Sequence, residues 1–174
     1  ITLLPGRKLA RPTNITNFRT PRLGLGINLS GRVQLMDPDN PLKYQVYVKF
    51  TGRLQLGEGW NVFAVYSKNI QQDFDTIRGP NSHLKHVRSE VNQYLVHGKT
   101  GLESLIVERT GGWRSSLYYR AYGGVLEEMF TGGGFEVLFH PFRSRMGVGL
   151  TVNGVQQRDY YRGFGLRDYR TTTS

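Results

Sequence analysis

Two neighbouring stretches decide the fold of this chain: residues 22–35 read RLGLGINLSGRVQL, and residues 42–56 read LKYQVYVKFTGRLQL. In both stretches apolar residues alternate with polar or small ones without a slip. Because side chains on a strand point alternately to opposite faces, each stretch predicts a β-strand with one apolar and one polar face. Strands of globular sheets usually have about five or six residues, whereas a tilted strand of about 9–11 residues crosses a bilayer. The length and the alternation are together typical of an outer-membrane β-barrel.

Five further stretches show the same alternation and are separated by turn-forming residues. We expect these strands at residues 60–68, 102–109, 113–125, 135–139 and 146–157, with turns at residues 57–59 and 111–112 and a glycine-rich loop at 131–134. Val87, Val91 and Leu95 recur at helical spacing ahead of Gly98, which predicts a short helix in the long loop. The predicted fold class is therefore all-β: an antiparallel meander of about seven long strands, a segment of an outer-membrane β-barrel, with one short helix.

The organisation along the chain is that of a single unit, residues 1–174. We expect an extended lead-in at residues 1–21, the strands within residues 22–157, and a polar tail at 158–174. The expected connections are short at one end of the sheet and longer at the other, as in outer-membrane barrels. Because single-chain barrels typically have an even number of strands, seven strands predict an open sheet. We expect residues 22–35 and 146–157 each to pair with strands outside this sequence.

Composition and charge exclude several classes of function. The chain has 23 Lys and Arg against 13 Asp and Glu, a formal charge of +10, which favours a negatively charged partner. The cations are spread along the chain and no RNA-binding motif occurs, which argues against nucleic acid. An acidic polysaccharide or a lipid headgroup surface is an equally good electrostatic match, and a basic surface that only keeps the protein soluble explains the charge without a partner. The absence of cysteine excludes a thiolate zinc site and a cysteine nucleophile. No stretch approaches the roughly 18 apolar residues of a membrane helix.

Several short motifs occur in a fixed order from about residue 60 onward. They are His86-Val87-Arg88-Ser89-Glu90, Thr100-Gly101-Leu102-Glu103, the run Val125–Phe142 (VLEEMFTGGGFEVLFHPF), Gln157-Arg158-Asp159 and Phe164-Gly165-Leu166-Arg167-Asp168-Tyr169. In this order they resemble the YjbH family of Gram-negative envelope proteins, over roughly residues 60–170.

The resemblance implies a location and a role. The family is associated with exopolysaccharide and group 4 capsule production, and its members look like large outer-membrane β-barrels, often described as lipoproteins. Members are several times longer than this chain, so the resemblance implies an internal segment of a larger protein in the outer membrane of a Gram-negative cell. Its implied partners are outer-membrane lipid, the rest of the parent barrel and other polysaccharide-secretion proteins. The family brings no catalytic residues to carry over.

Two groups of side chains invite a catalytic or metal-binding interpretation. Glu127 and Glu128 invite a glycosidase interpretation, because these enzymes use a carboxylate pair, and either residue with Glu136 makes the better-placed pair. Adjacent strand residues point to opposite faces, however, so arginine-paired carboxylates at a loop edge are the interpretation we favour. His83, His86 and His97 lack the further ligand that a closed zinc site needs. We expect no catalytic residue, no metal and no cofactor.

The polar face of the predicted strands holds the candidate site. Cations and tyrosines recur on it, whereas carboxylates on it are few by sequence, so it suits an acidic polymer: cations attract uronates, and aromatic rings stack on sugars. The candidate polysaccharide-binding or interior-lining residues are Arg22, Arg32, Lys43, Tyr47, Lys49, Arg53, Arg114, Tyr118, Arg120 and Tyr122. Ordinary solvation of a barrel interior explains the same pattern without a ligand.

Three functions remain open from the sequence. The first is an outer-membrane barrel protein that takes part in exopolysaccharide or capsule export or assembly and catalyses no reaction. The second is a soluble, basic β-sheet module that binds acidic polysaccharide. The third is an envelope glycosidase. Dependence on detergent distinguishes the first from the second, and release of reducing ends from an acidic polysaccharide would favour the third.

Overall fold

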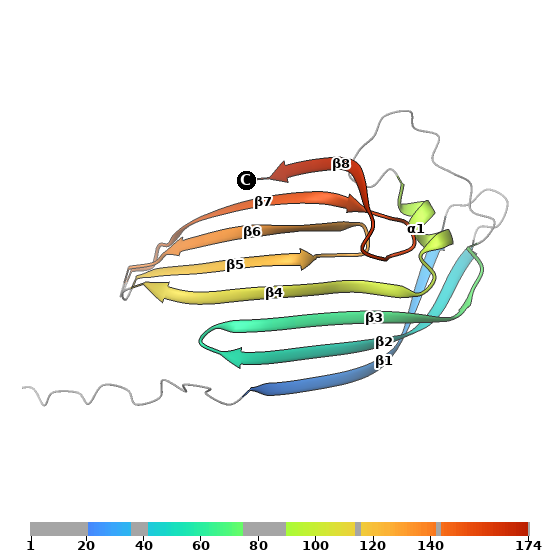
Figure 1. The fold of residues 1–174 in the computed structure, drawn as a ribbon, viewed down its shortest axis with the longest axis horizontal. Coiled ribbons are helices and arrows are strands. Elements are labelled where there is room, and N and C mark those ends of the chain that lie inside the picture. Colours follow the sequence, from blue (N-terminus) through green and yellow to red (C-terminus); the bar gives the residue numbers. More distant parts are fainter. Residues whose placement is uncertain (1–20, 36–41, 75–89, 114–115, 142–143, 174) are drawn as a thin grey trace, which may run out of the picture.

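The computed structural model describes residues 21–35, 42–74, 90–113, 116–141 and 144–173. Within these residues one antiparallel sheet of eight strands follows the order of the sequence, with one short helix (Figure 1). The elements are β1 Arg22–Leu35, β2 Leu42–Gly57, β3 Trp60–Gln72, α1 Val91–His97, β4 Gly101–Trp113, β5 Leu117–Val125, β6 Phe130–Phe139, β7 Val148–Arg158 and β8 Leu166–Thr173.

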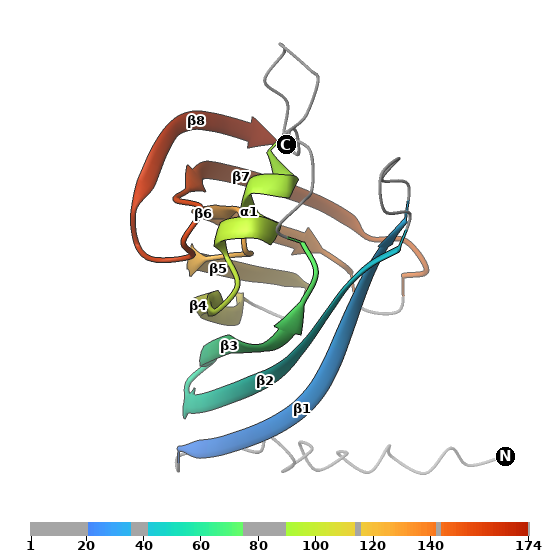
Figure 2. The same cartoon turned by 90° about the vertical axis from the view of Figure 1, so that its right-hand side faces the viewer.

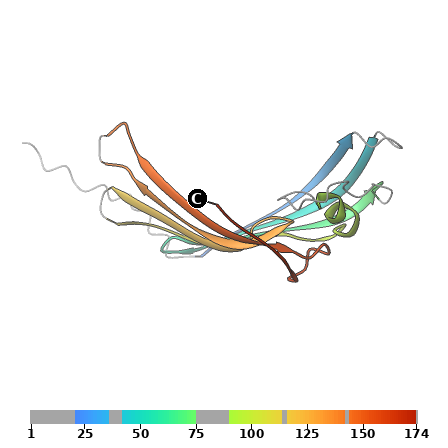
Figure 3. The same cartoon turned by 90° about the horizontal axis from the view of Figure 1, so that it is seen from above.

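The sheet is strongly curved, and α1 lies inside the curve (Figures 2 and 3). The face on which α1 lies is called the concave face and the opposite one the convex face. The strand register carries the polar set of β1 and β2 across the concave face: Asn28 lies opposite Lys49, and Lys49 opposite Ser67. On the other side of the same strands, Ile27 lies opposite Phe50, and Phe50 opposite Tyr66. The alternation in the sequence therefore becomes two chemically distinct faces.

The burial of the two faces is the reverse of that in a soluble sheet, because the apolar face is exposed and polar residues on the other face are buried. On the convex face, Leu25 and Ile27 of β1 are 77% and 72% exposed, and Leu150 of β7 is 64% exposed. On the concave face, Lys43, Gln45 and Tyr47 of β2 are all buried. The convex apolar surface runs from β1 to β7 with two cations in it, Lys68 and Arg109, and it ends at β8, which places Asp168 and Arg170 there.

The connections differ between the two ends of the sheet mainly through one segment, the long β3–β4 connection; the β6–β7 connection, at the end predicted to have short ones, is longer than the β5–β6 loop at the other end. One end has the two-residue turn Glu58–Gly59 between β2 and β3, where Gly57, Glu58 and Gly59 all have positive φ. Glycine adopts this left-handed conformation without strain, which explains the two glycines of the turn. The other end carries the long β3–β4 connection with α1, together with the β5–β6 and β7–β8 loops (Figure 1). The candidate site lies at this end of the sheet, whereas the β6–β7 connection lies at the other end.

Helix α1 packs on the concave face through a small apolar core. Tyr94 of α1, Met129 of the β5–β6 loop and Phe130 of β6 form the buried cluster, and Val155, Tyr160 and Tyr169 pack against it. Gly98 caps the helix C-terminus, and its N–H donates to the carbonyl of Tyr94 at 2.9 Å. The predicted stop at Gly98 is confirmed, and Val87 lies outside the described residues. No helix of the described part of the chain is long and apolar enough to cross a membrane.

The predicted count of seven strands is wrong, because residues expected to be a polar tail form β8. β8 pairs with β7, so the expectation that residues 146–157 pair outside this sequence is also wrong. β7 itself begins at Val148. The strand β1 agrees with its predicted bounds to the residue, and among the described residues it pairs with β2 alone.

Two glycine-rich segments lie in strands and not in the predicted turns. Gly111 and Gly112 belong to β4, opposite Tyr119 and Tyr118, so Trp113 ends β4 and does not begin the next strand. The predicted loop at residues 131–134 lies inside β6, where Gly132 pairs with Gly124 of β5. The sheet is open: β1 and β8, its first and last strands, do not pair with each other.

Candidate functional site

Nine of the ten candidate residues lie on the concave face, as the strand register shows. They are Arg22, Arg32, Lys43, Tyr47, Lys49, Arg53, Tyr118, Arg120 and Tyr122. The tenth, Arg114, lies outside the described residues. The alternation of side chains thus brings together residues of β1, β2 and β5, but it does not reveal which partners meet them.

Carboxylates meet three of these cations, so the expectation of few carboxylates on this face is wrong. Arg32 reaches Glu128 at 2.6 Å, and Lys49 reaches Glu103 at 2.9 Å. The ring of Tyr47 lies between the two cations, with its centroid 5.8 Å from the Arg32 guanidinium and 5.4 Å from the Lys49 ammonium. Nearby charges and an aromatic face thus stabilise both cations in a partly buried setting.

Arg120 forms the third pair, nearer the middle of β5. Its guanidinium contacts Glu108 of β4 at 2.9 Å and Glu136 of β6 at 3.3 Å, and it lies over the ring of Tyr122. The hydroxyl of Tyr122 donates to Asn153 of β7. This cluster therefore connects four adjacent strands across the concave face.

Three candidate residues on this face are exposed, namely Arg22, Arg53 and Tyr118, and contacts are known in detail for the last two. Arg53 is exposed, and its guanidinium lies 4.7 Å from the ring centroid of Phe63 on β3. Tyr118 is 46% exposed and lines a cavity of about 420 Å³ with Gly111, Arg120, Glu136 and others. These two side chains are accessible to a ligand, whereas Lys43 and Tyr47 are buried.

Two residues of the site, Arg158 and Arg162, are not among the candidates from the strand alternation, because they fall in the expected polar tail. Arg158 is 1% exposed, and its guanidinium donates to five backbone carbonyls. These belong to Leu102 at the start of β4, Glu127 and Glu128 in the β5–β6 loop, and Arg162 and Gly163 in the β7–β8 loop. A single buried side chain thus fixes three segments, because five donors in one rigid plane suit several acceptors at once.

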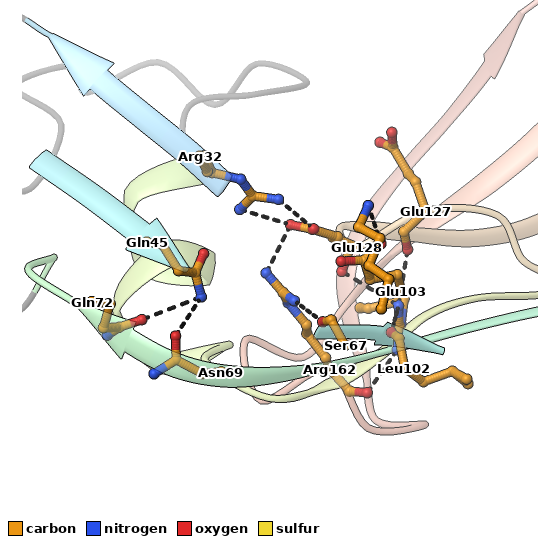
Figure 4. A network of polar contacts seen from close by, with 12 residues as sticks. Arg32, Gln45, Ser67, Asn69, Gln72, Leu102, Glu103, Glu127, Glu128 and Arg162 are labelled. Carbon is orange, nitrogen blue, oxygen red and sulfur yellow. Dashed lines mark hydrogen bonds and ion pairs between the residues drawn. The ribbon is translucent and has the colours of Figure 1, made fainter. Parts of the chain in front are cut away.

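Arg162, in the β7–β8 loop, connects the β5–β6 loop with β3. It donates to Glu128 at 2.8 Å and to the hydroxyl of Ser67 on β3 at 3.1 Å (Figure 4). Glu128 therefore accepts from two guanidinium groups, Arg32 and Arg162. Three polar atoms of the described network have no hydrogen-bond partner: Oε1 of Glu103 and the Nε atoms of Arg158 and Arg162.

Glu128 is held as an anion, which bears on the glycosidase interpretation. Burial alone disfavours its charged form, but the charge of Arg162 and the hydrogen bond and charge of Arg32 outweigh burial and leave the pKa of Glu128 below its usual value. A general acid of glycoside hydrolysis needs a raised pKa. The other carboxylate of the proposed pair, Glu136, contacts Arg120. The geometry thus matches arginine-paired carboxylates at a loop edge.

The ends of β7 and β8 near α1 are tied to it by polar contacts as well. The hydroxyl of Tyr94 donates to the carbonyl of Arg158, and burial raises the pKa of this phenol to about 12. Glu90, which precedes α1, accepts from Gln157 at 2.7 Å and lies 3.9 Å from Arg167. Helix α1 and Glu90 before it are therefore fixed to β7 and β8.

A cavity of about 530 Å³ lies beside α1, at the same end of the concave face. Its lining includes Arg32 and Val33 of β1, Leu95 of α1, and Glu127 and Glu128 of the β5–β6 loop. This volume is within the range of small-molecule sites. One wall is charged and the rest is largely apolar, so the cavity offers both ionic and van der Waals contacts.

The described residues hold no group of three or more His, Asp or Glu side chains that is arranged to bind a metal ion. His97 ends α1 beside the rings of Tyr160 and Tyr161. His83 and His86 lie outside the described residues.

The motifs quoted from the sequence meet at the α1 end of the sheet. Glu90 contacts Gln157, Arg158 contacts the carbonyls of Leu102 and Glu128, and Arg167 lies over the ring of Tyr160. Segments far apart in the sequence therefore build one site around α1. The motifs mark this site more closely than the strand alternation does.

Comparisons with known proteins agree with the motifs. The sequence profile of the YjbH family, described as "Exopolysaccharide biosynthesis protein YbjH", matches residues 6–174. Over 129 residues the chain is 33% identical to the uncharacterized lipoprotein YjbH of Escherichia coli (strain K12). This match covers 71% of the chain but 18% of the relative, so the chain spans less than a fifth of that protein's length. No solved structure matches the chain.

Proposed function

Because this chain belongs to the YjbH family of exopolysaccharide biosynthesis proteins, we propose that it forms part of an outer-membrane β-barrel that helps to export or assemble an acidic exopolysaccharide. In this proposal the convex face contacts lipid and the concave face lines the interior, where the polymer passes. The chain catalyses no reaction and uses no cofactor. Its partners are outer-membrane lipid, the acidic polymer, the remainder of the barrel and other polysaccharide-secretion proteins.

The reversed burial of the two faces carries this proposal. A soluble sheet buries its apolar face, yet here β1 to β7 leave theirs exposed while the concave face holds the buried charges. Burial of an apolar side chain of this size contributes about 1.5–3 kcal/mol, so water is an unfavourable solvent for this surface. Lipid removes the penalty. The arrangement matches the apolar-out, polar-in alternation of transmembrane barrels.

The open edges and the partial coverage support a larger barrel. β1 presents a 14-residue edge, and β8 ends the sheet with only 8 residues. Unpaired backbone groups at an edge cost several kcal/mol each in lipid, which excludes open edges from the hydrocarbon region. The chain also spans 18% of its relative. We therefore propose that strands of a longer parent protein complete the barrel. The name "lipoprotein" of the E. coli relative supports a place in the cell envelope.

The exposed concave groups are the proposed polymer contacts. Arg53 offers a charge for a uronate and Tyr118 a ring for a sugar face, and neither is buried. Arg109 provides a matched comparison, because it lies over the ring of Trp60 on the convex face much as Arg53 lies over Phe63 on the concave one.

The experiment measures binding of tetragalacturonate to the parent protein in lipid nanodiscs, with the variants Arg53→Gln and Arg109→Gln. We expect Arg53→Gln to weaken binding several-fold and to reduce its salt dependence, whereas Arg109→Gln leaves both unchanged. Salt matters because the Debye length falls from about 10 Å at 0.1 M to about 3 Å at 1 M.

The alternatives give different results. Equal effects of both variants, or no binding, would contradict polymer recognition by the concave face. Purification without detergent as a monodisperse protein would favour the soluble polysaccharide-binding module. Release of reducing ends from the oligosaccharide would favour a glycosidase.

A further inference from the structure

The ion pair of Arg32 and Glu128 crosses the concave face. Arg32 belongs to β1, whose neighbour in the sheet is β2, whereas Glu128 belongs to the loop between β5 and β6, 96 residues away in the sequence. The contact therefore does not join neighbouring strands. It extends through Arg162 to Ser67 of β3, so that one chain of polar contacts spans the interior of the curved sheet (Figure 4).

Glu128 occupies a cradle of two guanidinium groups. Its Oε1 lies 2.6 Å from Arg32, and its Oε2 lies 2.8 Å from Arg162. Guanidinium groups match carboxylates in shape as well as in charge, which makes paired arginines a specific site for this group. The side chains of Arg32 and Glu128 remain 29% and 22% exposed, and both line the cavity of about 530 Å³. A ligand in that cavity can thus reach Arg32 directly, and it reaches Arg162, which is buried behind Glu128, once the Glu128 side chain has moved aside.

We propose that Arg32 and Arg162 form a binding subsite for a carboxylate group of the acidic polymer, and that Glu128 is an internal occupant which the polymer displaces. This inference rests on the proposed function, because it assumes an acidic polymer at the concave face. The exchange replaces one carboxylate by another, so neither arginine loses its counter-charge. With Glu128 bound, the contact closes the α1 end of the face; with polymer bound, the contact is released.

The backbone around Glu128 suits such an exchange. Arg158 holds the carbonyls of Glu127 and Glu128 at 2.9 and 3.4 Å, and the N–H groups of Leu126 and Glu127 both donate to the carbonyl of Phe130. The loop is therefore fixed, and rotation of the Glu128 side chain is sufficient to empty the cradle.

Substitutions on the two sides of the ion pair are expected to have opposite effects on binding. Glu128→Gln removes the competing charge, so tetragalacturonate should bind about tenfold more tightly. Arg32→Gln removes half of the cradle, and binding should weaken by about tenfold. If the ion pair of Arg32 and Glu128 served stability alone, both variants should lose binding or neither variant should change it.

The experiment uses the parent protein in nanodiscs, with tetragalacturonate as the charged probe and maltotetraose as the neutral one. Asp168→Asn on the convex side of β8 controls for the loss of one negative charge, and Arg109→Gln for the loss of one positive charge. Arg162 is buried, and Glu128→Gln removes the negative charge beside it, so this variant risks misfolding. Glu128→Asp keeps the charge with a shorter reach, and it should tighten binding to a smaller extent.

Each outcome either supports or overturns the carboxylate subsite. Tighter binding by both Glu128 variants with weaker binding by Arg32→Gln supports the subsite. Salt-dependent binding that none of these variants alters overturns the subsite and leaves the proposed function standing. Binding that weakens in all of them also overturns it. Failure of every form to bind the charged probe contradicts both proposals.

Discussion

Arginine placed at adjacent positions of β7 tests which face meets lipid. Val152 lies on the convex face opposite Phe135, and Thr151 lies on the concave face opposite Glu136. Both positions are exposed, Val152 to 43%. In water, therefore, Val152→Arg and Thr151→Arg should each change the free energy of unfolding by less than about 0.5 kcal/mol.

In a bilayer we expect the two substitutions to differ in their effect on the free energy of unfolding. Val152 lies four residues into β7, or about 13 Å along the strand at about 3.3 Å per residue. A tilt of about 45° turns this into a depth of about 9 Å below the strand's start, well inside an apolar band about 25 Å tall. Arginine there should cost about 2–4 kcal/mol, whereas arginine at Thr151 gains a carboxylate neighbour in Glu136.

The assay is urea unfolding of the parent protein refolded into phosphatidylcholine vesicles, followed by tryptophan fluorescence. We expect the unfolding constant of Val152→Arg to rise by at least about 30-fold and that of Thr151→Arg to stay within about threefold of the unsubstituted protein. Equal effects of the two substitutions, whether small or large, would refute the assignment of the convex face to lipid.

Two further predictions concern the α1 end. Arg158→Lys should destabilise the protein by about 3 kcal/mol, because one ammonium cannot reach carbonyls of three segments. Denaturant unfolding, together with limited proteolysis near α1, measures this loss. Unchanged stability would contradict the role given to Arg158. Glu128 has a lowered pKa, so its ion pairs contribute stability that is present above the usual pKa of Glu, about 4.3, and is lost as the pH falls below it. Unfolding midpoints of Glu128→Gln and the unsubstituted protein should therefore converge between pH 6 and pH 3; a constant gap would contradict this.

The strand alternation predicts the long strands well, because each side chain's direction depends only on its place in the strand. β1 and β2 keep this pattern for 14 and 16 residues, and the register needs no bulge between them. Their faces, and the side on which nine of the ten candidate residues lie, follow from the alternation alone. Strand lengths of this order also distinguish the sheet from ordinary globular ones.

β8 could not be found in the same way, because neither of its faces is apolar. Leu166–Thr173 reads LRDYRTTT, and pairing with β7 supplies what its own pattern lacks. Its threonines and tyrosine favour a strand and were the available signal. Gly111 and Gly112 were wrongly predicted as a turn, because glycine is common in turns. In the structure they lie within β4, opposite tyrosines of β5.

The ion pairs of the site depend on tertiary structure. Glu128 meets Arg32 only because the sheet curves, and Arg162 and Arg158 reach it from a loop that follows β7 and from the end of that strand. Nothing in the local sequence indicates these distances. The motifs did indicate the segments involved, and the structure supplies the reason that they belong together.

A barrel built from this sheet requires lipid at the convex face and water at the concave face. A nitroxide scan of residues 148–153 on β7, in the parent protein in bilayers, tests this directly, and this chain contributes no cysteine that would have to be removed. Labels at residues 148, 150 and 152 should be accessible to oxygen and shielded from a water-soluble nickel chelate, and labels at residues 149, 151 and 153 should show the reverse. Equal access of the nickel chelate to both sets would contradict the account.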